Sequence, residues 1–258
     1  MSNKLVNVWN EHEGLTGYYG QLLKSQAAAI FRKHTLPEKA EDWKPEELRE
    51  RIWKALGVRI DHSLPLELEV TGTIACDGYR IEKICYQSRP DFFVTGNLYI
   101  PEGNGPFPAV INMHGHWSQG RLAERVQQRG HLLAKSGYVC LSVDAFGSGE
   151  RSTQHGEFEY HGNNLGGSLM QFGETLMGVQ VVDNMRGVDL LCSLPYVDAA
   201  RIGATGASGG GNQTMWLAAM DTRVMAAVPV VSVGSFQSYV MGLNCVCELL
   251  PDGLTFTE

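Results

Sequence analysis

Short apolar segments alternate with longer amphipathic segments through the second half of the chain, and this alternation constrains the fold more than any other feature. The apolar segments, which predict strands, cover residues 108–113, 138–143, 201–205 and 224–233. Apolar residues at helical spacing predict helices between them, within residues 122–136, 172–194 and 207–220. Continuously apolar strands are typical of a parallel sheet that is buried on both faces. Repeated strand and helix units therefore predict a three-layer α/β fold with a mostly parallel sheet.

The first part of the chain carries two other patterns. Helical spacing predicts one helix around Leu22–Phe31 and a second that has Pro45 in its first turn and stops at Gly57. From Leu66 the apolar period changes to two, which predicts three antiparallel lead-in strands. They lie around residues 66–71, 79–86 and 92–100. We therefore expect a helical N-terminal extension over residues 1–65 and an α/β domain over residues 66–258.

Composition excludes several classes of protein. Of the 258 residues, 43% are hydrophobic and 19% are charged, which is enough apolar material for a buried core. A net charge of −7 offers no basic face for a nucleic acid. No segment approaches the roughly 20 apolar residues that span a membrane, and the polar stretch Met1–Glu13 is not a secretory signal. The sequence predicts a cytoplasmic protein without nucleic-acid or membrane partners, and it leaves open a signal already removed and the oligomeric state.

The six cysteines do not follow the spacing of a disulfide framework. One residue separates Cys245 from Cys247, which is closer than the usual spacing in a zinc half-site, and there is no second pair. We therefore expect buried, reduced thiols and neither a metal nor another cofactor.

The strongest chemical signal is the segment Gly206-Ala207-Ser208-Gly209-Gly210. It fits the motif G-x-S-x-G between a predicted strand and a predicted helix, where a serine is held in a strained turn. The small neighbours are needed because the strand and the helix approach closely. The head of the helix favours developing negative charge, so Ser208 is the predicted nucleophile for acyl transfer. The alternative is a glycine-rich turn that binds phosphate or only packs, but a Walker lysine is missing.

A second signal, His114-Gly115-His116-Trp117, follows the strand over residues 108–113. In acyl transfer on such a turn, one oxyanion-hole N–H comes from the residue after the nucleophile, here Gly209. The other comes from a loop after an upstream strand, so we expect the backbone N–H of His116 to be the second donor. The His114 side chain is a candidate for the substrate pocket, although structural hydrogen bonding is the interpretation that we favour.

These motifs together resemble the α/β-hydrolase superfamily. The resemblance is carried by His114-Gly115-His116, by residues 144–151, and by residues 197–203 leading into the turn at Ser208. It is closest to acetyl xylan esterase-like and dienelactone hydrolase-like members and spans roughly Leu66 to Pro251. The resemblance implies a mostly parallel sheet flanked by helices and the hydrolysis of carboxylic esters, often on carbohydrates. That chemistry needs no metal or cofactor.

The resemblance also bears on charged residues near the expected cleft. Asp144 is expected to brace a loop, because the acid of the family follows the serine in the chain. Arg151 either binds a substrate carboxylate or pairs with a neighbouring glutamate. The segment Gly147–Ser168 is predicted to be a long loop that overhangs the carboxyl ends of the strands and shapes the substrate pocket.

The chain departs from the superfamily pattern after Ser208. The family triad runs serine, acid, histidine, but no histidine follows His161. Glu248 is the candidate acid, with a solvated loop carboxylate as its alternative. The chain is therefore expected to be a fragment of a longer esterase, a pseudoenzyme, or an enzyme that borrows an upstream histidine. The fragment is favoured, because the fold looks C-terminally incomplete: the sequence stops before the sheet could be completed.

The predicted function is that of a serine ester hydrolase acting through an acyl-enzyme on acetylated or otherwise esterified carbohydrate. A serine peptidase of the same fold is an alternative, because the turn alone does not separate esters from amides. The contrasting class is an inactive binding module that keeps the pocket. Labelling and turnover that depend on Ser208 separate this class from the enzymes.

Overall fold

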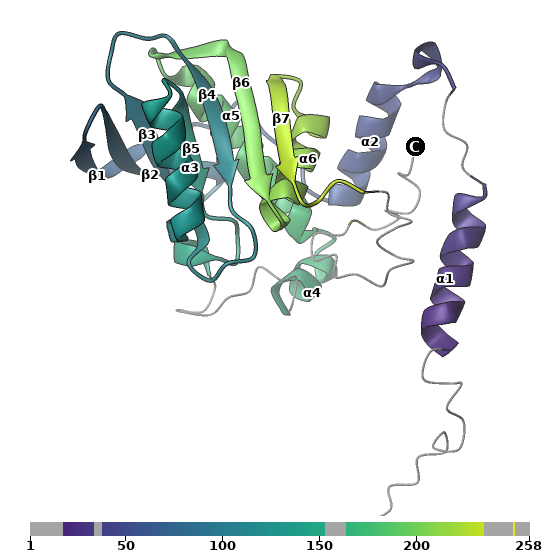
Figure 1. Cartoon of the computed structure of the whole chain (residues 1–258). Coiled ribbons are helices and arrows are strands. Elements are labelled where there is room, and N and C mark those ends of the chain that lie inside the picture. Colours follow the sequence, from purple (N-terminus) through teal and green to yellow (C-terminus); the bar gives the residue numbers. More distant parts are fainter. Residues whose placement is uncertain (1–17, 34–37, 153–163, 235–249, 251–258) are drawn as a thin grey trace, which may run out of the picture. The chain divides into compact units, whose positions relative to one another are not determined.

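A computed structural model describes residues 18–33, 38–152, 164–234 and 250 (Figure 1). By their internal contacts these residues fall into two compact units. The smaller contains residues 18–33, 38–45 and 234, and the larger contains residues 46–152, 164–233 and 250. Within the smaller unit, helix α1 (Tyr18–Phe31) covers the first predicted helix, and a short 3-10 turn, η2 (Ala40–Asp42), follows.

All strands of the described residues belong to the larger unit. Its elements are α2 (Pro45–Leu56), β1 (Glu69–Cys76), β2 (Tyr79–Arg89), β3 (Phe92–Pro101), β4 (Phe107–Met113), η3 (Gly120–Leu122), α3 (Glu124–Lys135), β5 (Val139–Val143), η4 (Gly149–Arg151), α4 (Asn164–Gln171), α5 (Leu176–Ser193), β6 (Val197–Ala207), α6 (Gly209–Met220) and β7 (Val224–Val230). Within the described ranges, no helix is both long enough and apolar enough to cross a membrane.

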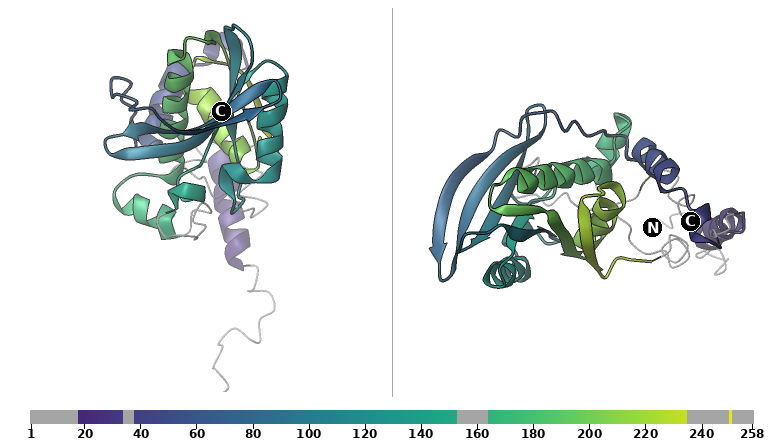
Figure 2. Two further views of the ribbon diagram at one scale, coloured as in Figure 1. Left: turned by 90° about the vertical axis from the view of Figure 1, so that its left-hand side faces the viewer. Right: turned by 90° about the horizontal axis from the view of Figure 1, so that it is seen from above.

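The strands form one seven-stranded mixed sheet in the order β1-β2-β3-β5-β4-β6-β7. The lead-in strands β1, β2 and β3 pair antiparallel, and β3 also runs antiparallel to β5. The pairs β5–β4, β4–β6 and β6–β7 are parallel. Seen from above, α5 and α3 lie on opposite sides of the sheet (Figure 2). The predicted α/β fold, with its antiparallel lead-in, is confirmed.

Helix α5 is the centre of the core. Nearly all of its residues are buried, because it contacts the sheet strands and also packs on α6. Thr175 caps its first turn, since the Gly178 N–H donates to Thr175 Oγ1 over 2.9 Å. The buried side chains include Val179 and Val182, which pack against Val58. One face of the sheet is therefore closed by an almost wholly buried helix.

Helix α2 matches the second predicted helix, since it begins at Pro45 and is followed by Gly57 at a φ of 72°. Within the larger unit, side chain to backbone hydrogen bonds hold it to its neighbours. Thr175 Oγ1 donates to the Leu56 carbonyl over 2.8 Å, and Arg49 Nε donates to the Ala219 carbonyl over 2.9 Å. The expected domain boundary between residues 65 and 66 stays a prediction.

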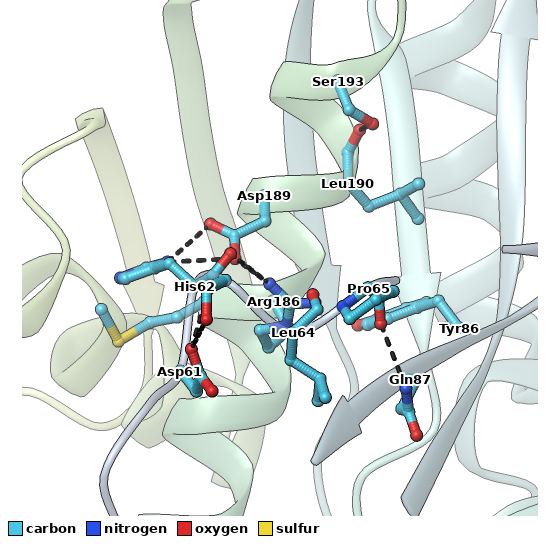
Figure 3. A network of polar contacts seen from close by, with 12 residues as sticks. Asp61, His62, Leu64, Pro65, Tyr86, Gln87, Arg186, Asp189, Leu190 and Ser193 are labelled. Carbon is cyan, nitrogen blue, oxygen red and sulfur yellow. Dashed lines mark hydrogen bonds and ion pairs between the residues drawn. The ribbon is translucent and has the colours of Figure 1, made fainter. Parts of the chain in front are cut away.

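Polar contacts tie the segment after α2 to α5 (Figure 3). His62 Nδ1 lies 3.0 Å from Asp189 Oδ1, and Arg186 donates to the Leu64 carbonyl. In the same region Gln87 Nε2 donates to the Pro65 carbonyl over 3.1 Å. These contacts fix the extended segment that leads into β1.

The prediction of a long loop over Gly147–Ser168 is partly wrong. The structure places η4 at its start and the first turns of α4 at its end, and residues 153–163 lie outside the described residues.

Phe172 matched the helical spacing of α5, yet it lies outside that helix and is 82% exposed. The reason is local: Gly173, at a φ of 78°, interrupts the helical pattern before α5 begins.

The burial expected for the strand over residues 224–233 is also wrong. β7 forms, but Met225 and Val228 are 69% and 60% exposed. Among the described strands β7 is the last in the sheet order and pairs with β6 alone. A continuous apolar run predicts a strand, but the burial of that strand depends on whether other elements pack against its faces.

Candidate active site

Ser208 occupies the turn between β6, which ends at Ala207, and α6, which begins at Gly209. Its backbone has a φ of 59° and a ψ of −125°, which is strained for a residue with a side chain. The turn is held because the Ser208 N–H donates to the Val230 carbonyl over 2.9 Å, and the Gly211 N–H donates to the Ser208 carbonyl over 2.8 Å. Ser208 is exposed. A strained backbone therefore presents this residue at the head of a helix.

The glycines of the turn are needed because backbone segments approach closely. A Cβ atom on Gly206 would lie 2.3 Å from the Gly210 carbonyl oxygen. One on Gly210 would lie 2.4 Å from the Met113 carbonyl oxygen at the end of β4. The turn can thus form only where the strand, the helix and β4 meet without side chains between them.

This close approach predicts the effect of Gly210→Ala. The added methyl must displace the backbone at the end of β4, so we expect the free energy of unfolding to fall by about 1–3 kcal/mol. Chemical denaturation measures it. Gly167→Ala in α4 is the matched control, because a Cβ there would meet nothing within 4 Å and alanine favours a helix. Equal destabilisation of both variants would contradict the prediction.

The loop after β4 lies against this turn. A Cβ atom on Gly115 would lie 2.5 Å from the Ala207 carbonyl oxygen and 3.0 Å from the Trp117 ring. Gly209 is the first residue of α6, where backbone N–H groups have no partner within the helix. The structure thus brings the loop that carries His116 to the turn that carries Ser208 and Gly209. The oxyanion roles of the two N–H groups stay predictions.

His114 is buried and only 1% exposed. The Ala145 N–H donates to His114 Nε2 over 3.0 Å, so Nε2 is an acceptor and the proton sits on Nδ1, which donates to the Gly115 carbonyl over 2.7 Å. Burial lowers the pKa of His114 from 6.5 to about 4. The neutral ring therefore joins the loops after β4 and β5, and this geometry favours the structural interpretation over contact with substrate.

Arg151 belongs to a buried network that joins η4 to α5 and β3. Its Nη1 lies 2.7 Å from Asp183 Oδ2, and both side chains are almost wholly buried. Its Nε donates to the Phe93 carbonyl over 2.9 Å. The expectation of a neighbouring glutamate partner is wrong, because tertiary packing places η4 against an aspartate of α5. The pairing favours a bracing role, and substrate binding by Arg151 stays a prediction.

Asp144 is buried at the end of β5 and connects several elements. It accepts hydrogen bonds from the Arg121 N–H and from Thr95 Oγ1, each over 3.0 Å, and forms an ion pair with the Arg121 side chain. This agrees with the expectation that Asp144 braces a loop. Neither Arg121 nor Asp183 was predicted, because no pattern in the sequence marks either residue as buried.

Two further expectations concern the chain after β7 and the cysteines. Glu248, the candidate acid, lies outside the described residues. Cys76, Cys85, Cys140 and Cys192 carry free thiols, of which Cys140 is buried. Within the described ranges, no group of three or more His, Cys, Asp or Glu side chains is placed to hold a metal ion.

In sequence and fold the chain is similar to esterases. A sequence model of the family described as acetyl xylan esterase (AXE1) matches residues 38–241. The solved structure of Methylesterase BT1017 matches with a TM-score of 0.66 and 28% identity, over 90% of this chain and 48% of its own. An acetyl xylan esterase from Paenibacillus sp. R4 matches with a TM-score of 0.52, over 77% of this chain and 62% of its own, and at 20% identity it shares the fold.

Two proteins of Bacillus subtilis (strain 168) are similar in sequence. YtaP, which carries the name of a hydrolase, is 28% identical over 158 residues, or 57% of this chain and 49% of its own. YuxL, named an uncharacterized peptidase, is 30% identical over 164 residues, or 61% of this chain and 22% of its own. The chain thus spans about half the length of YtaP and less than a quarter of the length of YuxL.

Proposed function

The chain belongs to the acetyl xylan esterase (AXE1) family, and we propose that it is a serine carboxylic ester hydrolase that acts on esterified carbohydrate. The observation that carries the proposal is the backbone of Ser208, which has a φ of 59° at an exposed turn between a strand and a helix. Strain of this kind is retained where the surrounding structure requires it, and it is common at catalytic sites. The likeness to a methylesterase at 28% identity supports the same class of chemistry.

In the proposed mechanism, Ser208 Oγ attacks the carbonyl carbon of the ester and loses its proton to a base. The negative charge on the carbonyl oxygen is stabilised by the backbone N–H groups of Gly209 and His116. The tetrahedral intermediate expels the alcohol, which takes a proton, and leaves an acyl group on Ser208. Water then attacks the acyl-enzyme and releases the acid. His114 is unsuited as the base, because backbone groups occupy both of its ring nitrogens.

The test compares the wild-type chain with Ser208→Ala, using p-nitrophenyl acetate and a fluorophosphonate probe. We expect the wild type to release p-nitrophenol, to gain an acetyl group on the peptide that contains Ser208, and to be labelled by the probe. Ser208→Ala should show none of these. Ser136→Ala, which removes an exposed serine at the end of α3, is the matched control and should react like the wild type. Reactivity that is unchanged by Ser208→Ala would contradict the proposal. No reactivity at all would contradict an active enzyme for this chain, and would fit a binding module or a fragment of a longer esterase.

A serine peptidase is the second candidate, because YuxL is named a peptidase and is 30% identical over 61% of this chain. Both reactions use the same nucleophile and oxyanion hole, and they differ in the leaving group. A p-nitroanilide and a p-nitrophenyl ester with the same acyl group separate them. Hydrolysis of the ester alone supports the esterase, and Ser208-dependent hydrolysis of the anilide at a comparable rate supports the peptidase.

A further inference from the structure

We propose that a groove beside the Ser208 turn binds a sugar ring of the substrate, with Trp117 and Arg125 as its principal contacts. The proposal rests on the proposed function, since it places the carbohydrate part of an ester whose acyl group reaches Ser208. The groove has a volume of about 580 Å³, which is within the usual range for small-molecule sites. Its walls include Trp117, Gln119, Leu122, Arg125 and Gln128.

The position of Trp117 connects the groove with the candidate active site. Trp117 follows the predicted oxyanion loop directly, and its ring lies against Gly115. The Ala207 carbonyl lies on the same side of Gly115, because a Cβ atom there would meet both its oxygen, at 2.5 Å, and the Trp117 ring, at 3.0 Å. Ala207 immediately precedes Ser208. The aromatic wall of the groove and the end of the strand that leads into the Ser208 turn therefore flank the same point beside Gly115.

The chemistry of the walls suits a sugar. The Trp117 ring offers an aromatic surface, and the Arg125 guanidinium lies 4.9 Å from its centroid, which holds the two side chains together. Sugars combine apolar C–H faces with many hydroxyl groups; a guanidinium group donates hydrogen bonds to hydroxyl oxygens, and an amide group both donates and accepts. Arg125 and Gln128 are both exposed on α3 and supply such groups.

The charges of the groove favour a neutral ligand. Glu124 and Arg125 both line it, so their formal charges cancel. Gln128 Nε2 donates to Glu124 Oε1 over 2.9 Å, one helical turn apart, which orders the polar wall before any ligand arrives. Leu122 is 50% exposed and adds an apolar surface. We therefore infer that neutral sugar rings bind here in preference to rings that carry free carboxylates.

The test measures binding apart from turnover, by titrating the Ser208→Ala chain with a neutral xylo-oligosaccharide in a calorimeter. We expect the Kd to rise about tenfold with Arg125→Ala and by at least as much with Trp117→Ala. Leu132→Ala is the matched control, since Leu132 is an exposed apolar residue of α3 outside the groove, and its Kd should not change. An oligogalacturonide should bind more weakly than the neutral oligosaccharide.

Thermal unfolding of each variant identifies loss of structure. If Trp117→Ala unfolds, the Kd of Arg125→Ala alone tests the proposal, because Arg125 is exposed and its substitution should leave the fold unchanged. No binding of the oligosaccharide, or binding that is equally tight in all variants, would contradict sugar binding in the groove. Binding that depends on Arg125 in a chain without Ser208-dependent hydrolysis would contradict the proposed function and support sugar binding in the groove. Ser208-dependent hydrolysis without Arg125-dependent binding would support the proposed function and contradict sugar binding in the groove.

Discussion

Arg151→Met is expected to lower the free energy of unfolding by about 3–5 kcal/mol, because it leaves the carboxylate of Asp183 buried without its counter-charge. The two side chains lie 2.7 Å apart and are 4% and 3% exposed. The Arg151 guanidinium also stacks over the Phe92 ring at 5.0 Å from its centroid. Methionine keeps much of the volume and the apolar contact, so the loss reports chiefly on the charge. Urea unfolding followed by circular dichroism measures it.

A second substitution separates the pair from its packing. Arg151→Met together with Asp183→Leu should recover most of the loss, because no buried charge is then left unpaired. The exposed pair Arg201 and Asp198 is the matched control, and Arg201→Met should cost at most about 1 kcal/mol. A cost for Arg151→Met as small as that of the control would contradict the bracing role. A raised KM for an ester with a carboxylate would then support the predicted role in substrate binding.

Acidification from pH 6.5 to pH 4 is expected to destabilise the chain through His114, whose pKa burial lowers from 6.5 to about 4. Between these values the unfolded chain binds a proton at this position and the folded chain does not, so the free energy of unfolding falls as the pH falls. Above pH 6.5 both forms are neutral and the contribution is constant. Between pH 6.5 and pH 4, protonation of His114 should lower the free energy of unfolding by about 3 kcal/mol.

Carboxylates titrate in the same interval, so the prediction concerns a difference between two proteins. The free energy of unfolding of the wild type and of His114→Gln should be measured by urea unfolding at several pH values. We expect the wild type to lose more stability than the variant on acidification, and the difference to vanish above pH 7. Parallel pH profiles would show that His114 can accept a proton in the folded chain. That result would reopen His114 as a residue of the pocket.

Local patterns predicted the elements near Ser208 well. The glycines around Ser208 allow a close turn at any position in a chain, and the apolar run before them makes a strand on its own. Pro45 and Gly57 likewise mark the ends of α2 through their own backbone preferences. Such features depend on a residue and its immediate neighbours, and the sequence is sufficient for them.

Other features required partners that are distant in the chain. Arg151 meets Asp183 of α5, and Arg121 meets Asp144, only because the sheet brings these elements together. The same packing occupies both ring nitrogens of His114 and leaves Met225 of β7 exposed. No periodicity encodes these pairings, since they depend on which elements become neighbours in space.

The sequence by itself determined the class of fold, the order of its elements and the identity of the serine in the strained turn. Those properties follow from backbone conformation and from the period of apolar residues, which are local. The tertiary structure decided that Arg151 and Asp183 form a buried pair between η4 and α5, and that Trp117 lines a groove. The reason is physical: a side chain acquires a role in binding or bracing only from the groups that packing brings within a few ångströms of it.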